Sequence, residues 1–263
     1  MPEGHVIHRL ATGLSRTLGA EPVSATSPQG RFAESAALLD GEPLERAEAW
    51  GKYLFVRFGG GSLLHVHLGL IGKFRDKGTD PPEPTDTVRL RLRNDGGCWD
   101  LTGPTRCELI TPEKQRSIVA NIGADPLRRR PDVTAARLRF ARTSKAVGAV
   151  LLDQSVISGL GNIYRAEILF LCGIHPLRPA REVSDQEFDA IWAESVRLLR
   201  IGVRTGRIVT TVPAEIGRSI GRMRAEDTLY VYHRDHCRRC GTEIRTVALA
   251  GRPIQFCPHC QPD

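Results

Sequence analysis

The spacing of apolar and polar residues changes twice along the chain. In residues 4–18 the apolar side chains recur every three or four positions, which predicts one amphipathic helix close to the N-terminus. Its apolar stripe consists of Val6, Ile7, Leu10, Leu14 and Leu18. From about residue 20 to 115 the period becomes two, the spacing of strands, and after residue 136 helical spacing returns.

The region of period two contains two predicted hairpins. KYLFVRF and SLLHVHL are separated by GGG, and VRLRLR and CWDL are separated by NDGG. The region is therefore predicted to be an antiparallel β domain, either a sandwich or a flattened barrel. Within it, Arg89, Arg91 and Arg93 alternate with apolar residues. They predict a solvated sheet face, with a DNA contact as the alternative.

The stretch GADPLRRRPDV (123–133) breaks both periods and indicates an interdomain linker. Helices are expected at SKAVGAVLLDQ, at IYRAEILFLC, and after Ser184, which with Glu187 forms a capping-box pattern. Residues 205–228 show no clear period. The expected domains are residues 1–122 (β-sandwich), 123–135 (linker), 136–228 (helical domain) and 229–263 (cysteine module).

The charge balance favours a polyanionic partner. Lys and Arg number 37 against 30 Asp and Glu, which gives a formal net charge of +7 and an isoelectric point near 9.3. The first residues lack a signal-peptide core, and the most apolar stretch is interrupted by Asn162, Arg165 and Glu167. We therefore expect no membrane segment and a cytoplasmic location.

Four of the seven cysteines form two close pairs near the end of the chain. Cys237 and Cys240 are followed, after sixteen residues, by Cys257 and Cys260. This spacing is typical of a zinc ribbon with four thiolate ligands, which leaves no open position and predicts one structural Zn²⁺. Four free cysteines in a surface tail are the alternative. The remaining cysteines, Cys98, Cys107 and Cys172, are expected to fill core space.

Three short motifs have both a chemical and an ordinary interpretation. Arg252 in the predicted finger hairpin could bind a phosphate or be a solvated surface residue. Asn162 follows a Gly-x-Gly turn, which could bind an anion at a helix N-terminus or simply join two helices. Pro2 would carry a secondary amine after removal of Met1, and Glu3 lies beside it for proton transfer, although a motif of two residues is weak evidence.

Longer motifs give these residues a context. MPEG, GKYL (51–54), LLDQSVISGLGNIYRAEILF (151–170), GIHPLRPA (173–180), and CRRCGTEI with GRPIQFCPHCQ resemble, in the same order, the Fpg/Nei family of DNA glycosylases. The resemblance spans nearly the whole chain. It implies an α+β multidomain fold: an N-terminal helix with an antiparallel β-sandwich, a helix-two-turn-helix domain, and a C-terminal zinc-finger β-hairpin.

The resemblance also implies roles for individual residues. Pro2 matches the family's nucleophile, Glu3 its general acid/base, and Lys52 the lysine that contacts DNA and assists catalysis. Asn162 and Arg252 match the pair that binds the phosphate beside the extruded nucleotide. Leu70, with Ile71 beside it, matches the residue that fills the void in the DNA stack, although by pattern alone both could be core residues.

Two departures point to one branch of the family. This chain has DLTGPTRCEL (100–109) where the branch that acts on oxidised purines usually has an Arg-x-Phe-Gly turn, and Gly148 where that branch usually has lysine. Both resemble the endonuclease VIII (Nei) branch, which acts on oxidised pyrimidines. A further departure is the pair His5 and Val6, which replaces the usual Pro-Glu and puts base recognition in doubt.

The sequence therefore predicts a bifunctional DNA glycosylase and abasic-site lyase of base excision repair that removes oxidised pyrimidines through a Pro2 Schiff base with β,δ-elimination. Preference for oxidised purines is one alternative, and a non-catalytic zinc protein that binds damaged or single-stranded DNA is another. The expected partner is damaged double-stranded DNA, with single-stranded or bubble DNA left open. We expect a monomeric, nucleoid-associated protein of bacterial type.

Overall fold

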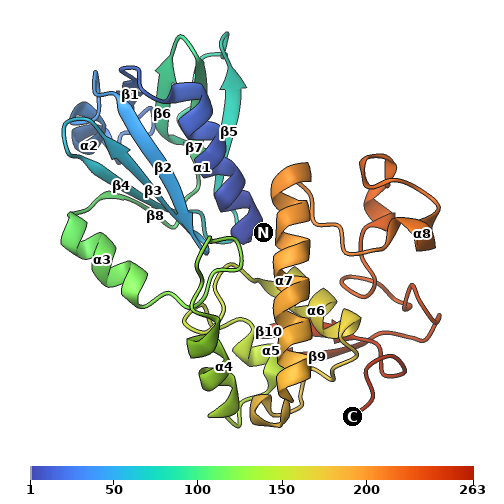
Figure 1. Ribbon diagram of the computed structural model, residues 1–263. Helices are drawn as coiled ribbons and strands as arrows, with labels where there is room; N and C mark the ends of the chain where they lie inside the picture. Colours follow the sequence, from blue (N-terminus) through green and yellow to red (C-terminus); the bar gives the residue numbers. More distant parts are fainter. Residues whose placement is uncertain (1) are drawn as a thin grey trace. The chain divides into compact units, whose positions relative to one another are not determined.

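The amphipathic stripe near the N-terminus forms α1 (Gly4–Leu18) in the computed structural model, which describes residues 2–263. Its buried face includes Ile7, Leu10 and Leu14, as the period predicts. The chain divides into two compact units, Met1–Asn121 and Ile122–Asp263 (Figure 1). Each unit has its own hydrophobic core. This division is coarser than the four predicted segments.

The first unit is a sandwich of two antiparallel sheets, against which α1 packs. One sheet has the order β2-β3-β4-β8, built from Leu44–Trp50, Tyr53–Phe58, Leu63–His67 and Arg106–Leu109. The other has the order β1-β6-β7-β5, built from Ser24–Thr26, Val88–Asn94, Gly97–Thr102 and Lys73–Gly78. Apolar side chains of both sheets and of α1 form one core. The two predicted hairpins are confirmed as β3–β4 and β6–β7.

Two short helices interrupt or follow the strands of the first unit. They are α2 (Ala33–Ala37) and α3 (Pro112–Ala120). The expected β region extended to about residue 115 and missed α3, which begins after Thr111: its side chain accepts a hydrogen bond of 3.2 Å from the backbone N–H of Lys114. Thr before Pro at the first helical position is a strong start signal.

The arginine stripe on β6 is only partly solvated. Arg91 is buried and donates two hydrogen bonds to the carboxylate of Asp100 on β7, at 2.7 and 2.9 Å. The prediction of a solvated face is therefore wrong for Arg91, because a cross-strand carboxylate satisfies its guanidinium inside the sheet. Arg93, at the next position on that face, is exposed, as predicted.

The second unit is mainly helical. Its elements are α4 (Val133–Ala141), α5 (Val147–Val150), α6 (Asn162–Leu171), η1 (Ala180–Glu182), α7 (Asp185–Thr205), α8 (Pro213–Ile216), η2 (Ile220–Arg222), η3 (Ala225–Asp227), β9 (Arg245–Leu249) and β10 (Arg252–Phe256). The capping box of Ser184 and Glu187 is confirmed at the start of α7. The helix expected over SKAVGAVLLDQ shrinks to the single turn of α5. Its first N–H groups, of Val147 and Gly148, bond the carbonyls of Arg178 and Pro176 at 2.8 and 3.0 Å.

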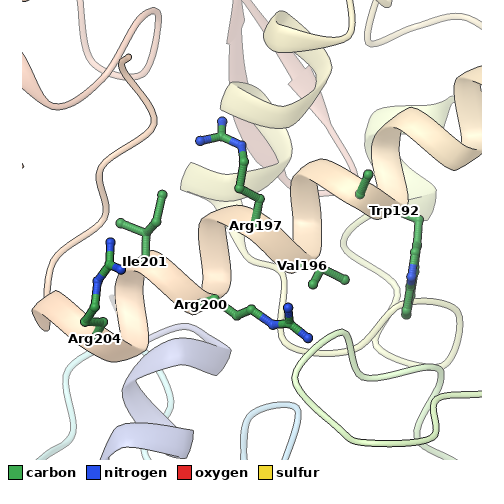
Figure 2. Close-up of a pocket in the computed structure, with 7 residues that line it drawn as sticks. Trp192, Val196, Arg197, Arg200, Ile201 and Arg204 are labelled. Carbon is green, nitrogen blue, oxygen red and sulfur yellow. The ribbon is translucent and has the colours of Figure 1, made fainter. Parts of the chain in front are cut away.

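The amphipathic helix α7 buries one face and exposes the other. Phe188, Ile191 and Leu198 enter the core of the second unit. Figure 2 shows side chains of α7 that line a pocket of about 610 Å³, among them Trp192, Arg200 and Arg204. Among residues 2–263, no helix combines the length and the apolar character needed to cross a membrane.

Candidate active site and DNA-binding residues

Pro2 and Glu3 lie at the N-terminal end of α1. Pro2 is half-buried, and Glu3, the N-cap residue, has extended backbone angles (φ −119°, ψ 177°) and a fully buried side chain. Its side chain does not cap the helix. A carboxylate at this position lies near the partial positive charge of a helix N-terminus, which stabilises negative charge. The structure thus places a buried acid directly beside the residue expected to carry the amine.

Lys52 lies in the turn between β2 and β3, where Trp50 pairs with Tyr53. Gly19, just after α1, pairs with Leu44, and the side chain of Ser15 accepts a hydrogen bond of 2.9 Å from the N–H of Ala47. The N-terminal half of α1 therefore runs towards the end of β2 (Figure 1). From that contact, the helix back to Gly4 and the strand on to Lys52 each span roughly 16 Å. Pro2, Glu3 and Lys52 consequently lie at the same end of the first unit.

Two histidines of β4 lie near Lys52 and were not singled out by the sequence pattern. The ring of His65 stacks on Tyr53 and Phe55, with centroids 5.6 and 5.1 Å apart, and its Nδ1 lies 3.0 Å from Glu108. The ring of His67 meets Tyr53 edge-on at 5.1 Å. Burial, followed by the charges of His65 and Lys52, lowers the pKa of His67. Their only signal in the sequence was the alternation HVH within a strand.

Leu70 and Ile71 protrude from the loop between β4 and β5. Their side chains are 56% and 78% exposed, so the alternative that they are core residues is wrong. The loop adopts one tight shape: Gly69 has φ +68°, and a Cβ there would lie 1.8 Å from the hydroxyl of Thr105. Exposed aliphatic side chains on a rigid loop suit insertion into an apolar environment such as a base stack.

Asn162 and Arg252 are brought together across the second unit. Asn162 begins α6, and its Nδ2 donates a hydrogen bond of 3.0 Å to the carbonyl of Pro253, the residue after Arg252. Arg165, one turn along α6, is fully buried and donates to the carbonyls of Arg252 and Pro253 at 3.3 and 3.2 Å. The finger hairpin is therefore held on α6 beside the Gly-x-Gly turn.

The charged residues of α6 were used in the sequence analysis only to exclude a membrane segment. In the structure Glu167 anchors a neighbouring part of the chain, because its buried carboxylate accepts hydrogen bonds of 2.8 Å from the N–H groups of Tyr230, Val231 and Tyr232. Three donors to one carboxylate fix the segment that enters the finger. A buried charge in an apolar helix was the signal that could have revealed this role.

The four paired cysteines converge at the end of the chain. Their sulfur atoms lie within 4.8 Å of one another, with Cys240 at 3.5 Å from both Cys257 and Cys260, and Cys237 at 4.0 Å from Cys260. A tetrahedral zinc ion with Zn–S bonds of about 2.3 Å separates its ligands by about 3.8 Å. The cysteines therefore fit one structural Zn²⁺, and the alternative of four dispersed surface thiols is wrong.

His5 replaces a residue that is usually proline in the family, and the structure buries it in the first turn of α1. Burial lowers the pKa of His5 to about 4. Between pH 6.5 and 4, the His5 ring is protonated in the unfolded chain but stays neutral in the folded chain. The free energy of unfolding should therefore fall by about 3 kcal/mol as the pH drops through this window, and the contribution is complete above pH 6.5.

The measurement is urea unfolding at pH 7.5, 6 and 5, with an NMR titration of the His5 ring. His5→Asn should flatten the pH dependence, and His8→Asn, on the same helix, should retain it. An unchanged slope in His5→Asn would contradict the assignment.

Comparisons with known proteins agree with this arrangement. Residues 1–107 match the formamidopyrimidine-DNA glycosylase N-terminal domain, residues 122–214 match the H2TH domain of the same glycosylase, and residues 236–262 match the zinc finger found in FPG and IleRS. Endonuclease 8 1 of Mycobacterium tuberculosis is 44% identical over 267 residues, which cover 99% of this chain and 100% of that protein.

Two further relatives come from Lactococcus lactis. Its formamidopyrimidine-DNA glycosylase is 28% identical over 99% of this chain and 98% of that protein. A solved complex between the Lactococcus lactis Fpg and an abasic site containing DNA has a TM-score of 0.78 and 25% identity, and covers 99% of this chain and 100% of that one. The chain therefore belongs to the Fpg/Nei family and is a DNA glycosylase of base excision repair with abasic-site lyase activity.

Proposed function

We propose that this enzyme removes oxidised pyrimidines from damaged double-stranded DNA and then cuts the strand at the resulting abasic site. The observation that carries the choice of substrate is the 44% identity to an Endonuclease 8, against 28% to 33% to several formamidopyrimidine-DNA glycosylases. The short turn between β7 and β8 and the glycine at position 148 support the same branch.

Pro2 is the proposed nucleophile. Once Met1 is removed, its secondary amine titrates far below a lysine, so that a useful fraction is unprotonated near neutral pH and attacks C1′ of the damaged nucleotide. The bond from C1′ to the base breaks, and the base leaves with a proton. The nucleotide must first leave the stack, because inside the duplex its sugar is out of reach of Pro2.

Glu3 and Lys52 complete the proposed catalytic set. Glu3 transfers protons at the sugar, for which a buried carboxylate beside the nucleophile is well placed. After the base has left, the C1′–O4′ bond of the sugar breaks as O4′ takes a proton from Glu3, and Pro2 and C1′ form a cationic iminium. The iminium acidifies the C2′–H bond, so that loss of this proton expels the 3′ phosphate and a second elimination expels the 5′ phosphate. Lys52, at the same end of the unit, contacts the DNA and supports these steps.

The remaining residues bind DNA rather than react. Asn162 and Arg252 hold the phosphate beside the extruded nucleotide, since an amide and a guanidinium both donate to phosphate oxygens. Leu70 and Ile71 occupy the space left in the stack. The zinc held by Cys237, Cys240, Cys257 and Cys260 supplies structure only, because four thiolates leave it no open coordination position. We further propose that the enzyme acts as a monomer in the bacterial cytoplasm.

Borohydride trapping tests substrate and mechanism together. Protein with a native, untagged N-terminus is mixed with duplexes that carry thymine glycol, 8-oxoguanine or an abasic site, and the adduct is located by mass spectrometry. We expect an adduct on Pro2 with thymine glycol and with the abasic site, formed at least about tenfold faster for thymine glycol than for 8-oxoguanine.

The other outcomes separate the alternatives. If 8-oxoguanine were the only damaged base that gave a trapped adduct, the preferred substrates would be oxidised purines. Trapping only at the abasic site would support the lyase chemistry and contradict the proposed base preference. Binding without any adduct would favour a non-catalytic DNA-binding protein.

A further inference from the structure

Residues 213–228, which we call the arginine segment, are ordered with little hydrophobic core of their own. The segment contains α8, η2 and η3 and follows α7 (Figure 1). Between Pro213 and Asp227, all of which the structure describes, Met223 is the only buried side chain. Such a segment depends on polar contacts for its conformation, because few apolar contacts oppose local opening.

Several polar contacts tie the arginine segment to the chain on either side of it. Arg207 donates a hydrogen bond of 2.9 Å to the carbonyl of Met223, and the hydroxyl of Thr211 donates one of 2.8 Å to the carbonyl of Asp227. The hydroxyl of Tyr230 donates to Glu215 at 2.6 Å.

A further set of contacts comes from the cysteine module. Arg238 donates from Nε to the carbonyl of Leu229 at 3.2 Å and from Nη2 to the carbonyl of Glu226, and its Nη2 lies 3.5 Å from the carboxylate of Asp227. One guanidinium thus contacts two residues at the end of the segment and Leu229, which directly follows it. The side chains of Arg238 and Asp227 are only 20% and 18% exposed, which protects the ion pair from water.

Arg238 lies inside the first cysteine turn, one residue after Cys237 and two before Cys240. The turn is closed by hydrogen bonds from Cys237 to Thr242 and from Gly241 to Cys237, at 2.8 and 2.9 Å. A zinc ion bound by these cysteines holds the backbone of Arg238 in place. Its neighbour Arg239 has a different role, because its guanidinium lies over the rings of Phe170 and Tyr230, at 4.8 and 5.1 Å.

We propose that Arg238 is a positioning residue that holds the arginine segment in one conformation and makes the order of this segment depend on the zinc site. The consequence for DNA rests on the proposed function. Arg218, Arg222 and Arg224 are exposed on the segment, where Arg218 lies 3.3 Å from Asp227 and Arg224 lies 3.8 Å from Glu226. A held segment presents these guanidinium groups to a phosphate backbone in one arrangement. Release of the segment weakens binding without touching Pro2, Glu3 or a zinc ligand.

Hydrogen–deuterium exchange on the full-length, zinc-loaded protein without DNA tests the positioning role. In Arg238→Ala, amides of residues 213–228 should exchange at least about tenfold faster, while native mass spectrometry still finds one zinc per chain. Arg245→Ala removes an exposed arginine of the same finger and should leave exchange in the segment unchanged. Asp227→Asn, which removes the ion pairs of Asp227 with both Arg238 and Arg218, should accelerate exchange in the same direction.

The second part of the exchange experiment tests whether the order of the arginine segment depends on zinc. Chelation should accelerate exchange of the arginine segment in the wild-type protein but add little in Arg238→Ala, where the segment is already released. Unchanged exchange in zinc-loaded Arg238→Ala would overturn the proposal. Equal acceleration by chelation in both proteins would also overturn the proposal, because zinc would then order the segment without Arg238.

DNA binding is measured separately, with a duplex carrying a non-cleavable abasic analogue. Arg238→Ala should bind about three- to tenfold more weakly and lower the slope of log affinity against log salt by about one, the change expected for a lost phosphate contact. KM should rise by the same factor while kcat stays within about twofold, because the reacting residues are untouched. Faster exchange with unchanged affinity would support the positioning role and contradict the link to DNA.

Discussion

Pro2→Gly and Glu3→Gln should each lower the rate of base removal at least about a hundredfold, because they alter the proposed nucleophile and its proposed proton-transfer partner. Glycine retains a primary amine that still attacks C1′, but it lacks the ring that holds the nitrogen in one orientation before α1. Glutamine keeps the shape of Glu3 and its place in the buried N-cap position, yet it neither accepts nor releases a proton. The measurement is single-turnover excision of thymine glycol.

Binding and folding distinguish a chemical effect from a structural one. Affinity for a duplex with a non-cleavable abasic analogue should change by no more than about twofold, because neither variant removes a phosphate contact. Glu34→Gln, an exposed carboxylate in the first turn of α2, is the matched control and should retain wild-type rates. Wild-type rates of excision in both variants would contradict the roles proposed for the Pro2 ring nitrogen and the Glu3 carboxylate.

Removal of zinc, or Cys240→Ser, should abolish DNA cleavage and weaken DNA binding by at least about a hundredfold, while the first unit stays folded. Structural zinc contributes on the order of 10 kcal/mol to a small finger, far more than β9 and β10 gain by pairing alone. Without it the hairpin that carries Arg252 loses its support, and the contact of Asn162 with the carbonyl of Pro253 is lost with it.

The first unit has a separate core, so its strands should keep their amide protection in the metal-free protein. Cys172→Ser is the control, because Cys172 lies outside the four-cysteine cluster and should leave both zinc content and cleavage unchanged. Full activity in protein shown to be free of metal would rule out a structural requirement for zinc.

Local signals in the sequence predicted much of the fold. The stripe of α1, the glycine-rich turns between the paired strands and the capping box of Ser184 each depend on neighbouring residues, and the structure confirms them. Zinc binding was predictable for the same reason, since two CxxC turns contain the chemistry of a tetrahedral site. The sequence Thr-Pro-Glu (111–113) at the start of α3 is also a local helix-start signal, but the sequence analysis did not predict this helix.

Other features depend on residues far apart in the chain. The helix expected after Ser144 is reduced to the single turn α5, and its first N–H groups bond the distant carbonyls of Arg178 and Pro176. Arg91 is buried because Asp100 faces it across a strand pair. The placement of Pro2 and Lys52 at the same end of the first unit depends on the packing of α1 along β2, for which no local pattern exists. The resemblance to a family supplied those roles, and the structure supplied their geometry.

The glycine at position 148 also bears on how one branch of the family could be converted into the other. A Cβ at this position would lie 2.9 Å from Leu249 of the finger and 3.1 Å from the carbonyl of Pro176. The lysine usual in the purine branch would therefore require the Leu249 side chain to move and the carbonyl of Pro176 to shift by a few tenths of an ångström. A side chain at residue 148 is therefore coupled to the packing of the finger through Leu249, and a smaller residue at position 249 should make a lysine at position 148 easier to accommodate.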